Sequence, residues 1–190
     1  MTVFDVIRQV LLYLNEPELC DTVLLGGTQE PTDQQKEKVN LLINCVNDSI
    51  QTIATMYFPL KKEEVVTSTS GIYSFDLFSK PLLDILKVMD SRLRYTVDFS
   101  MFADHFESKV GSLLVVYTYL PTDVEFVADK LEIVENKVTA RMVAMSVMSK
   151  YYMILGMYQD AANWEEMFER AVLVAKRRKD NIVLKKRRWI

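Results

Sequence analysis

The sequence has few of the residues that build catalytic, metal or redox sites. It contains one histidine and two cysteines in 190 residues. Cys20 and Cys45 match neither a disulfide framework nor the ligand spacing of a zinc site. His105 lies near Asp104 and Glu107 without a second histidine or a thiolate to complete a coordination shell, and no serine or cysteine stands in a nucleophile-elbow context. We therefore expect no metal, no cofactor and no catalytic residue, and we predict that the protein is not an enzyme.

Long apolar runs, glycine and proline are also scarce. The longest uncharged stretch, residues 110–122, has 13 residues, whereas a membrane-spanning helix needs about 20. The first residues include Asp5 and no small-residue cleavage site, so we expect neither a signal peptide nor contact with a membrane. The adjacent glycines of LLGGTQEP lack the lysine of a phosphate-binding loop and predict only a turn. A composition of 49% apolar and 26% charged residues is typical of a globular protein.

Charge is distributed unevenly along the chain. The formal net charge is −3, but residues 176–190 carry eight bases and one acid. The remaining residues hold 15 bases and 25 acids, a net charge of −10. A basic end on an acidic body indicates that this end binds a polyanion, or an acidic surface on a partner or a neighbouring copy.

Apolar periodicity predicts helices at both ends of the chain. Two of them open with the spacing of a capping box, at Thr2 and at Thr32. Two more are predicted over residues 138–155, with Gly156 as the C-terminal cap, and from about 159 to 180.

Between residues 61 and 122 the apolar period falls to two, which predicts strands. In RLRYTVDF, residues 92–99, alternate side chains are apolar, so this stretch is expected to be the clearest strand. SLLVVYTYL, residues 112–120, is apolar on both faces and is expected to lie centrally in a sheet. DILKVMD predicts a further short strand.

The order of these elements predicts an α+β fold, in which the N- and C-terminal helices form a helical bundle with a small antiparallel β unit inserted between them. The expected divisions are an N-terminal helical half (1–60), the inserted β unit (61–125), a C-terminal helical half packing on the first (126–181) and an extended basic tail (182–190).

The predicted helix over residues 138–155 is apolar on almost every side. Such a helix must be covered on every side, and in a chain of this size we expect part of the cover to come from another subunit. The residues expected at this oligomer interface are Met142, Met145, Met148 and Tyr152.

The chain ends in VLKKRRWI, in which four consecutive bases precede a tryptophan and an isoleucine. Because Trp and Arg are frequent interface anchors, we expect the bases to meet an acidic surface while Trp189 fills an apolar pocket. A solvated terminus and a nucleic-acid contact remain open as alternatives. The predicted partner-binding residues are Lys185, Lys186, Arg187, Arg188, Trp189 and Ile190.

Three stretches together resemble the head–tail connector (adaptor) proteins of tailed bacteriophages, especially those of short-tailed phages. They are FDVIRQVLLYLNEPEL, VNLLINCVNDSIQTIATMYFPL, and TARMVAMSVMSKYYMILGMYQDAANWEEMFERAV followed by KKRRWI. The resemblance implies a structural virion protein of the neck, made in the host cytoplasm, which forms a ring, typically dodecameric, between the portal and the tail or nozzle proteins. It also implies a channel through which DNA passes without sequence-specific binding, and a segment, here Lys185 to Ile190, that reaches into the portal.

Two further function classes remain as alternatives. LGMYQDAANWEEMFERAV resembles one tetratricopeptide unit, which would indicate a helical-hairpin adaptor that binds peptides, although such arrays need about three repeats and only one is found. The basic end would also fit a DNA-binding accessory factor, whose affinity for duplex DNA falls steeply with salt.

Overall fold

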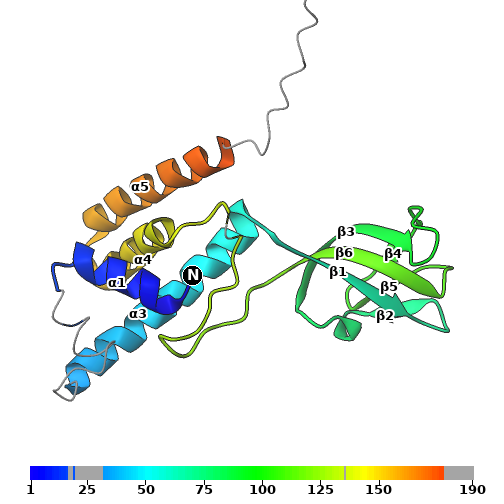
Figure 1. Ribbon diagram of the computed structural model, residues 1–190, viewed down its shortest axis with the longest axis horizontal. Helices are drawn as coiled ribbons and strands as arrows, with labels where there is room; N and C mark the ends of the chain where they lie inside the picture. Colours follow the sequence, from blue (N-terminus) through cyan, green and yellow to red (C-terminus); the bar gives the residue numbers. More distant parts are fainter. Residues whose placement is uncertain (17–18, 20–31, 135, 178–190) are drawn as a thin grey trace, which may run out of the picture. The chain divides into compact units, whose positions relative to one another are not determined.

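The chain divides into two compact units in the computed structural model, which describes residues 1–16, 19, 32–134 and 136–177 (Figure 1). The helical unit comprises Met1–Ser49, Glu125–Asp129 and Glu135–Ile190. The sheet unit comprises Ile50–Val124 and Lys130–Val134. Neither unit is therefore one continuous stretch of the sequence.

The described residues form four α-helices, α1 (Val3–Tyr13), α3 (Asp33–Thr52), α4 (Ala140–Ile154) and α5 (Tyr158–Arg177). The capping box predicted at Thr2 is confirmed, because the hydroxyl of Thr2 accepts a hydrogen bond from the Asp5 main-chain N–H while the Asp5 carboxylate accepts one from the Thr2 N–H. The Thr32 side chain and Gln35 make the same reciprocal pair ahead of α3. These bonds satisfy main-chain donors that a helix start leaves without a partner.

Helix α4 is the most buried helix of its unit and packs against both α1 and α5 (Figure 1). Gly156, at φ +75°, lies in the α4–α5 connection, where main-chain N–H groups of Gly156 and Met157 donate back to carbonyls of α4. This left-handed glycine cap turns the chain directly into α5, as predicted. The buried residues of α4 are Met142, Val143, Ala144, Met145, Ser146, Val147, Met148, Ser149 and Tyr151.

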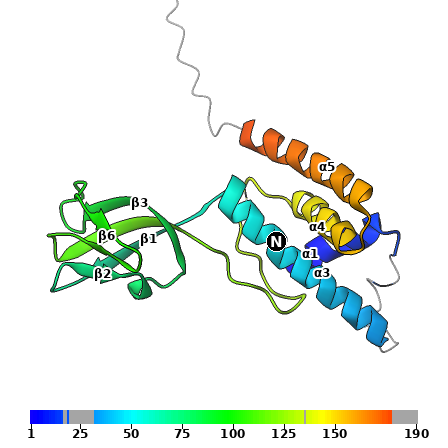
Figure 2. The same cartoon turned by 180° about the vertical axis from the view of Figure 1, so that it is seen from behind.

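The sheet unit contains two three-stranded antiparallel sheets (Figure 2). One sheet has the order β1-β6-β3 and the other the order β2-β5-β4. The central position predicted for residues 112–120 is confirmed, because β6 pairs with β1 on one side and β3 on the other. The strands are β1 (Leu60–Thr67), β2 (Ile72–Ser74), β3 (Leu82–Asp90), β4 (Ser100–Met101), β5 (His105–Glu107) and β6 (Ser112–Tyr119).

The core of the sheet unit is aromatic and draws residues from both sheets. The rings of Tyr73 and Phe106 stack with centroids 4.9 Å apart, and Phe78 meets Tyr117 edge-on at 4.8 Å. Both tyrosine hydroxyls are satisfied: Tyr117 donates to the Glu64 carboxylate at 2.6 Å, and Tyr73 donates to the carbonyl of Val110. Large aromatic rings can therefore be buried here without leaving a polar atom unpaired.

The predicted fold, a helical bundle with a small inserted β unit, is wrong. The structure is mixed, with four helices and two small three-stranded sheets whose strands occupy the middle of the described chain. The physical reason is that two sheets can bury a shared core between them. Residues 50–124 consequently form a compact unit with their own hydrophobic cluster.

The strand predicted at residues 92–99 is also wrong. Residues 91–93 form a turn, and only Thr96 makes a ladder bridge, to Met89. The alternation of apolar residues was real, but the Asp90 side chain takes the main-chain donors that a strand would have used.

Candidate interaction surfaces

The basic segment predicted to bind a partner, Lys185 to Ile190, lies outside the described residues. What the structure describes is the helix that leads to it. Acidic residues of α5 lie in its first two-thirds, at Asp160, Glu165, Glu166 and Glu169, whereas Lys176 and Arg177 occupy its last turn. This order is favourable for a helix dipole, and it gives α5 an acidic beginning and a basic end.

The four residues predicted at an oligomer interface lie mostly inside the helical unit. Met142, Met145 and Met148 are buried, and Tyr152 is half-buried with its ring 5.9 Å from that of Tyr151. The cover that was expected partly from another subunit is thus supplied, at the three methionines, by the same chain. The structure leaves only Tyr152 of this set partly accessible.

An exposed apolar cluster instead surrounds the α4–α5 connection. We call it the hairpin cluster; its side chains are between 46% and 72% exposed, and none of them was predicted at an interface. Large exposed apolar patches often mark a contact surface, and these five exposed side chains lie within six residues of the sequence. The hairpin cluster consists of Met153, Ile154, Leu155, Met157 and Tyr158.

A partly buried ion pair lies elsewhere in the helical unit. The Lys38 ammonium is 2.7 Å from both carboxylate oxygens of Glu16 and 5.8 Å from the centre of the Tyr151 ring. Burial opposes the charged form most strongly of the single effects, but the interactions of the ammonium with Glu16 and Tyr151 together outweigh it and raise the pKa of Lys38. Lys38 therefore joins α3 both to the segment that follows α1, at Glu16, and to Tyr151 of α4.

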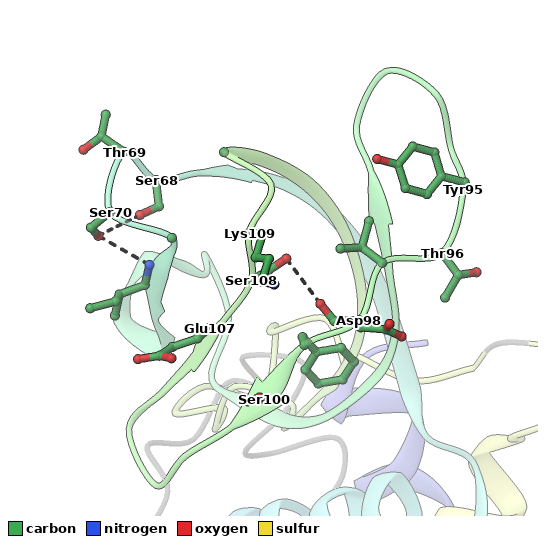
Figure 3. Close-up of a pocket in the computed structure, with 15 residues that line it drawn as sticks. Ser68, Thr69, Ser70, Tyr95, Thr96, Asp98, Ser100, Glu107, Ser108 and Lys109 are labelled. Carbon is green, nitrogen blue, oxygen red and sulfur yellow. Dashed lines mark hydrogen bonds between the residues drawn. The ribbon is translucent and has the colours of Figure 1, made fainter.

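The sheet unit has an open hollow of about 820 Å³ (Figure 3). Its walls are residues 68–72, 95–100, 107–109 and 111, and Figure 3 shows Ser68, Thr69 and Ser70 across from Tyr95 and Thr96. Gly71, at φ +78°, lets two walls touch, because a Cβ there would lie 2.6 Å from the Ser108 carbonyl oxygen. The lining is rich in hydroxyls and carries two carboxylates, those of Asp98 and Glu107.

Groups that could take part in metal or redox chemistry form no complete site in the described part of the chain. Within the described residues, no three His, Cys, Asp or Glu side chains could hold a metal ion together. His105 Nδ1 lies 2.6 Å from the Asp104 carboxylate, and its ring stacks on Phe102 at 4.7 Å. Burial raises the pKa of the Cys45 thiol to about 11, which keeps it protonated and unreactive at neutral pH.

No helix among the described residues combines the length and apolar character needed to cross a bilayer.

No protein-family model matches this chain, and no curated protein sequence matches it significantly. Function is therefore inferred from the residues and their geometry.

Sequence reasoning missed the hairpin cluster because its residues continue the apolar run of α4. The run MILGMY, residues 153–158, contains the helix-ending glycine, and side chains at a helix end have fewer neighbours to cover them. The position of that glycine could have predicted the exposed cluster. It marks where the apolar run leaves the packed part of α4 and becomes accessible.

Proposed function

We propose that the protein is a structural virion protein, a head–tail connector (adaptor) subunit of the short-tailed-phage type. Its subunits form a ring, dodecameric by the resemblance, in the neck of the virion. The ring docks on the portal, extends the DNA channel and provides a seat for tail or nozzle proteins. This protein is made in the host cytoplasm and is not an enzyme.

The hairpin cluster is the observation that carries the proposal. Five apolar side chains, each at least 46% exposed, lie within six residues on the α4–α5 hairpin. Burying such a patch is worth roughly 25 cal/mol per Å² of apolar surface removed from water. It also lies in one of the three stretches that resemble connectors. A subunit of a ring needs such a lateral contact surface.

The charge distribution supports the same proposal. An acidic body offers little attraction to DNA phosphates, so DNA can pass along the channel without being held. The basic segment 185–190 is proposed to dock in the portal, with Lys185, Lys186, Arg187 and Arg188 meeting acidic surface and Trp189 filling an apolar pocket.

The test is assembly of the purified chain with the portal rings of the same virus, followed by mass photometry and negative-stain imaging. The full chain should form rings on the portal. A Leu155→Asp chain should stay folded, because Leu155 is exposed, but should bind without completing a ring. A chain lacking residues 185–190 should lose portal binding.

Leu12→Asp is the matched control, because Leu12 is an equally exposed leucine on α1, away in sequence from the hairpin cluster. It should assemble like the parent. A stable monomer that never associates with portal rings would refute the connector proposal. Such a monomer would favour a peptide-binding adaptor, and salt-sensitive binding to duplex DNA would favour a DNA-binding factor.

A further inference from the structure

The turn between Asp90 and Tyr95 in the sheet unit presents a leucine at its tip. Leu93 is 74% exposed, the largest exposed fraction among the large hydrophobic residues described. It is flanked in sequence by Arg92 and Arg94, both exposed, and Tyr95 is half exposed at the edge of the hollow (Figure 3). An apolar tip between two guanidinium groups has the composition of an interface anchor.

The turn is held rigidly by Asp90. One carboxylate oxygen of Asp90 accepts hydrogen bonds from the main-chain N–H groups of Arg92, at 2.8 Å, and Leu93, at 2.7 Å. The Asp90 main chain closes the loop, accepting from the Arg94 N–H and donating to the Tyr95 carbonyl, each at 3.0 Å. A surface loop with four such bonds keeps its shape without a partner, so little conformational entropy is lost on binding.

The turn is also anchored at its base to the central strand of its sheet. The main-chain N–H of Ser91 donates to the carbonyl of Ser112, and the two serine hydroxyls lie 2.8 Å apart. Met89 bridges Thr96 across the two arms. The position of Leu93 is therefore fixed relative to β6.

Arg94 holds a strained main-chain conformation, with φ +55°. Glycine is the residue that adopts this left-handed region without cost, and another residue there costs about 1 kcal/mol or more. The turn therefore has a guanidinium where glycine would be more stable. Strain of this kind is concentrated at binding and switching sites.

Neither guanidinium has an acidic partner in the described part of the chain. The Asp90 carboxylate, which is nearest in sequence, is occupied by main-chain donors. Two unpaired cations beside an exposed apolar tip match a pocket that is apolar inside and carries carboxylates at its rim.

The charge of the sheet unit argues against a polyanion as the occupant. Residues 50–124 hold seven Lys and Arg against nine Asp and Glu. Proteins that bind nucleic acid strongly make about six to ten phosphate contacts, and this turn offers two cations on an acidic unit. A protein surface is the occupant that this chemistry fits.

We propose that the Asp90–Tyr95 turn is a docking knob that inserts Leu93 into an apolar, carboxylate-rimmed socket on the tail-side protein of the virion neck. This inference rests on the proposed function. A connector has a protein neighbour on each side, and segment 185–190 is proposed to contact only the portal. The knob supplies the contact to the other neighbour.

The experiment measures binding of the purified tail (nozzle) protein to preformed portal–connector complexes by biolayer interferometry. Leu93→Asp should weaken tail binding by more than about 10-fold, the effect of removing an interface anchor. Arg92→Glu with Arg94→Glu should slow association and reverse its dependence on salt. Portal binding should not change in either case, because the knob lies outside segment 185–190.

Leu77→Asp is the matched control, because Leu77 is an exposed leucine in another turn of the sheet unit. It should bind the tail protein like the parent. Arg94→Gly separates a structural role from a binding role. It should raise the midpoint of thermal unfolding, because the strain is relieved, while it weakens tail binding.

The knob is refuted if Leu93→Asp binds the tail protein within about 2-fold of the parent, or if Leu77→Asp weakens binding equally. It is also refuted if Arg92→Glu with Arg94→Glu removes binding to duplex DNA or to phosphatidylserine vesicles that the parent shows. A parent chain that binds the portal but not the tail protein refutes the knob and the tail-seating part of the proposed function, while docking on the portal still stands. A parent that binds neither refutes the proposed function as well.

Discussion

The helical unit and the sheet unit bury their apolar residues by different means. In the most buried helix, α4, the buried apolar side chains are mainly methionines and valines that follow one another along a single segment of the chain. The sheet unit instead brings Tyr73 of β2 together with Phe106 of β5 and Tyr117 of β6, which lie more than 30 residues further along the chain. The helical unit therefore depends on local periodicity and caps, and the sheet unit depends on long-range pairing and aromatic packing.

Both units contain carboxyl groups whose pKa is lowered in the folded protein: hydrogen bonds with Thr2 lower the pKa of Asp5 in the helical unit. In the sheet unit the Glu64 carboxylate accepts a hydrogen bond from the core residue Tyr117. The Glu132 carboxylate, in the 130–134 segment, accepts one from Lys80. Burial disfavours their charged forms, but hydrogen bonds from Tyr117 and Ser79 to Glu64, and from Lys80 to Glu132, hold both pKa values below the usual range. The carboxylates of the sheet unit hold its core and its 130–134 segment, so we expect this unit to lose stability when its aromatic core is truncated or when these two groups are protonated.

The largest expected effect is that of Phe106→Ala. Phe106 is fully buried and contacts Tyr73, Phe78 and Phe99. Its removal should lower the free energy of unfolding of the sheet unit by about 3–5 kcal/mol. Near-ultraviolet circular dichroism in a denaturant titration should report the loss, while the helical signal at 222 nm should persist to higher denaturant.

Leu77→Ala provides the comparison for that measurement, since it truncates an exposed side chain of the same unit. It should change stability by less than about 0.5 kcal/mol. If Phe106→Ala makes the helical and sheet signals disappear together, the two units unfold as one, and the contrast drawn above does not hold.

A smaller loss is expected from Tyr117→Phe, which removes one hydroxyl and leaves the ring. Burial, with the hydrogen bond to Glu64, raises the pKa of Tyr117 to about 12, so the group remains a donor at neutral pH. Losing a hydrogen bond to a charged group should cost about 1.5–3 kcal/mol. Urea titration at pH 7 measures this, and a neutral result would mean that another donor replaces the hydroxyl.

Gly156→Ala tests the helical unit. The residue has φ +75°, and a Cβ there would meet nothing within 4 Å, so any cost comes from backbone strain alone. The expected loss is about 1 kcal/mol, seen as a lower thermal midpoint of the 222 nm signal. An unchanged midpoint would show that the α4–α5 connection can adopt another conformation without cost.

The smallest effect is expected at the Lys80–Glu132 pair. The ammonium lies 2.6 Å from Glu132 and 2.9 Å from the Thr122 hydroxyl, and the Glu132 carboxylate also accepts the Thr122 N–H. Both side chains are about 30% exposed, so the pair should contribute no more than about 1 kcal/mol at pH 7. Lys80→Met removes that contribution, which hydrogen exchange of residues 130–134 should report as faster exchange.

The pH dependence of that contribution follows from the lowered pKa of Glu132. A carboxyl whose pKa is depressed by folding stabilises the protein above its unfolded pKa, and the contribution is lost as the pH falls through the folded value. The difference in unfolding free energy between the parent and Glu132→Gln should therefore be present at pH 7 and shrink below about pH 4. A difference that is constant with pH would show that the Glu132 side chain stabilises the fold by its packing and not by its charge.

Local signals in the sequence determined the helices and their starts. Thr2 and Thr32 cap because a side-chain oxygen three residues before a main-chain N–H can satisfy it whatever surrounds the helix. Gly156 ends α4 because only its own backbone needs to adopt φ +75°. The central position of β6 was also predictable, since both of its faces are apolar.

Only the tertiary structure decided which apolar residues are covered. Met148 and Leu93 both belong to regular apolar patterns, yet Met148 is fully buried between helices and Leu93 is the tip of a turn. The turn forms because Asp90 captures the N–H groups of Arg92 and Leu93, and the two sheets form because distant strands share one core. The core depends on residues far apart in the chain, and the turn depends on a side chain that competes with the main chain for hydrogen bonds. The apolar periodicity of the sequence carries information about neither.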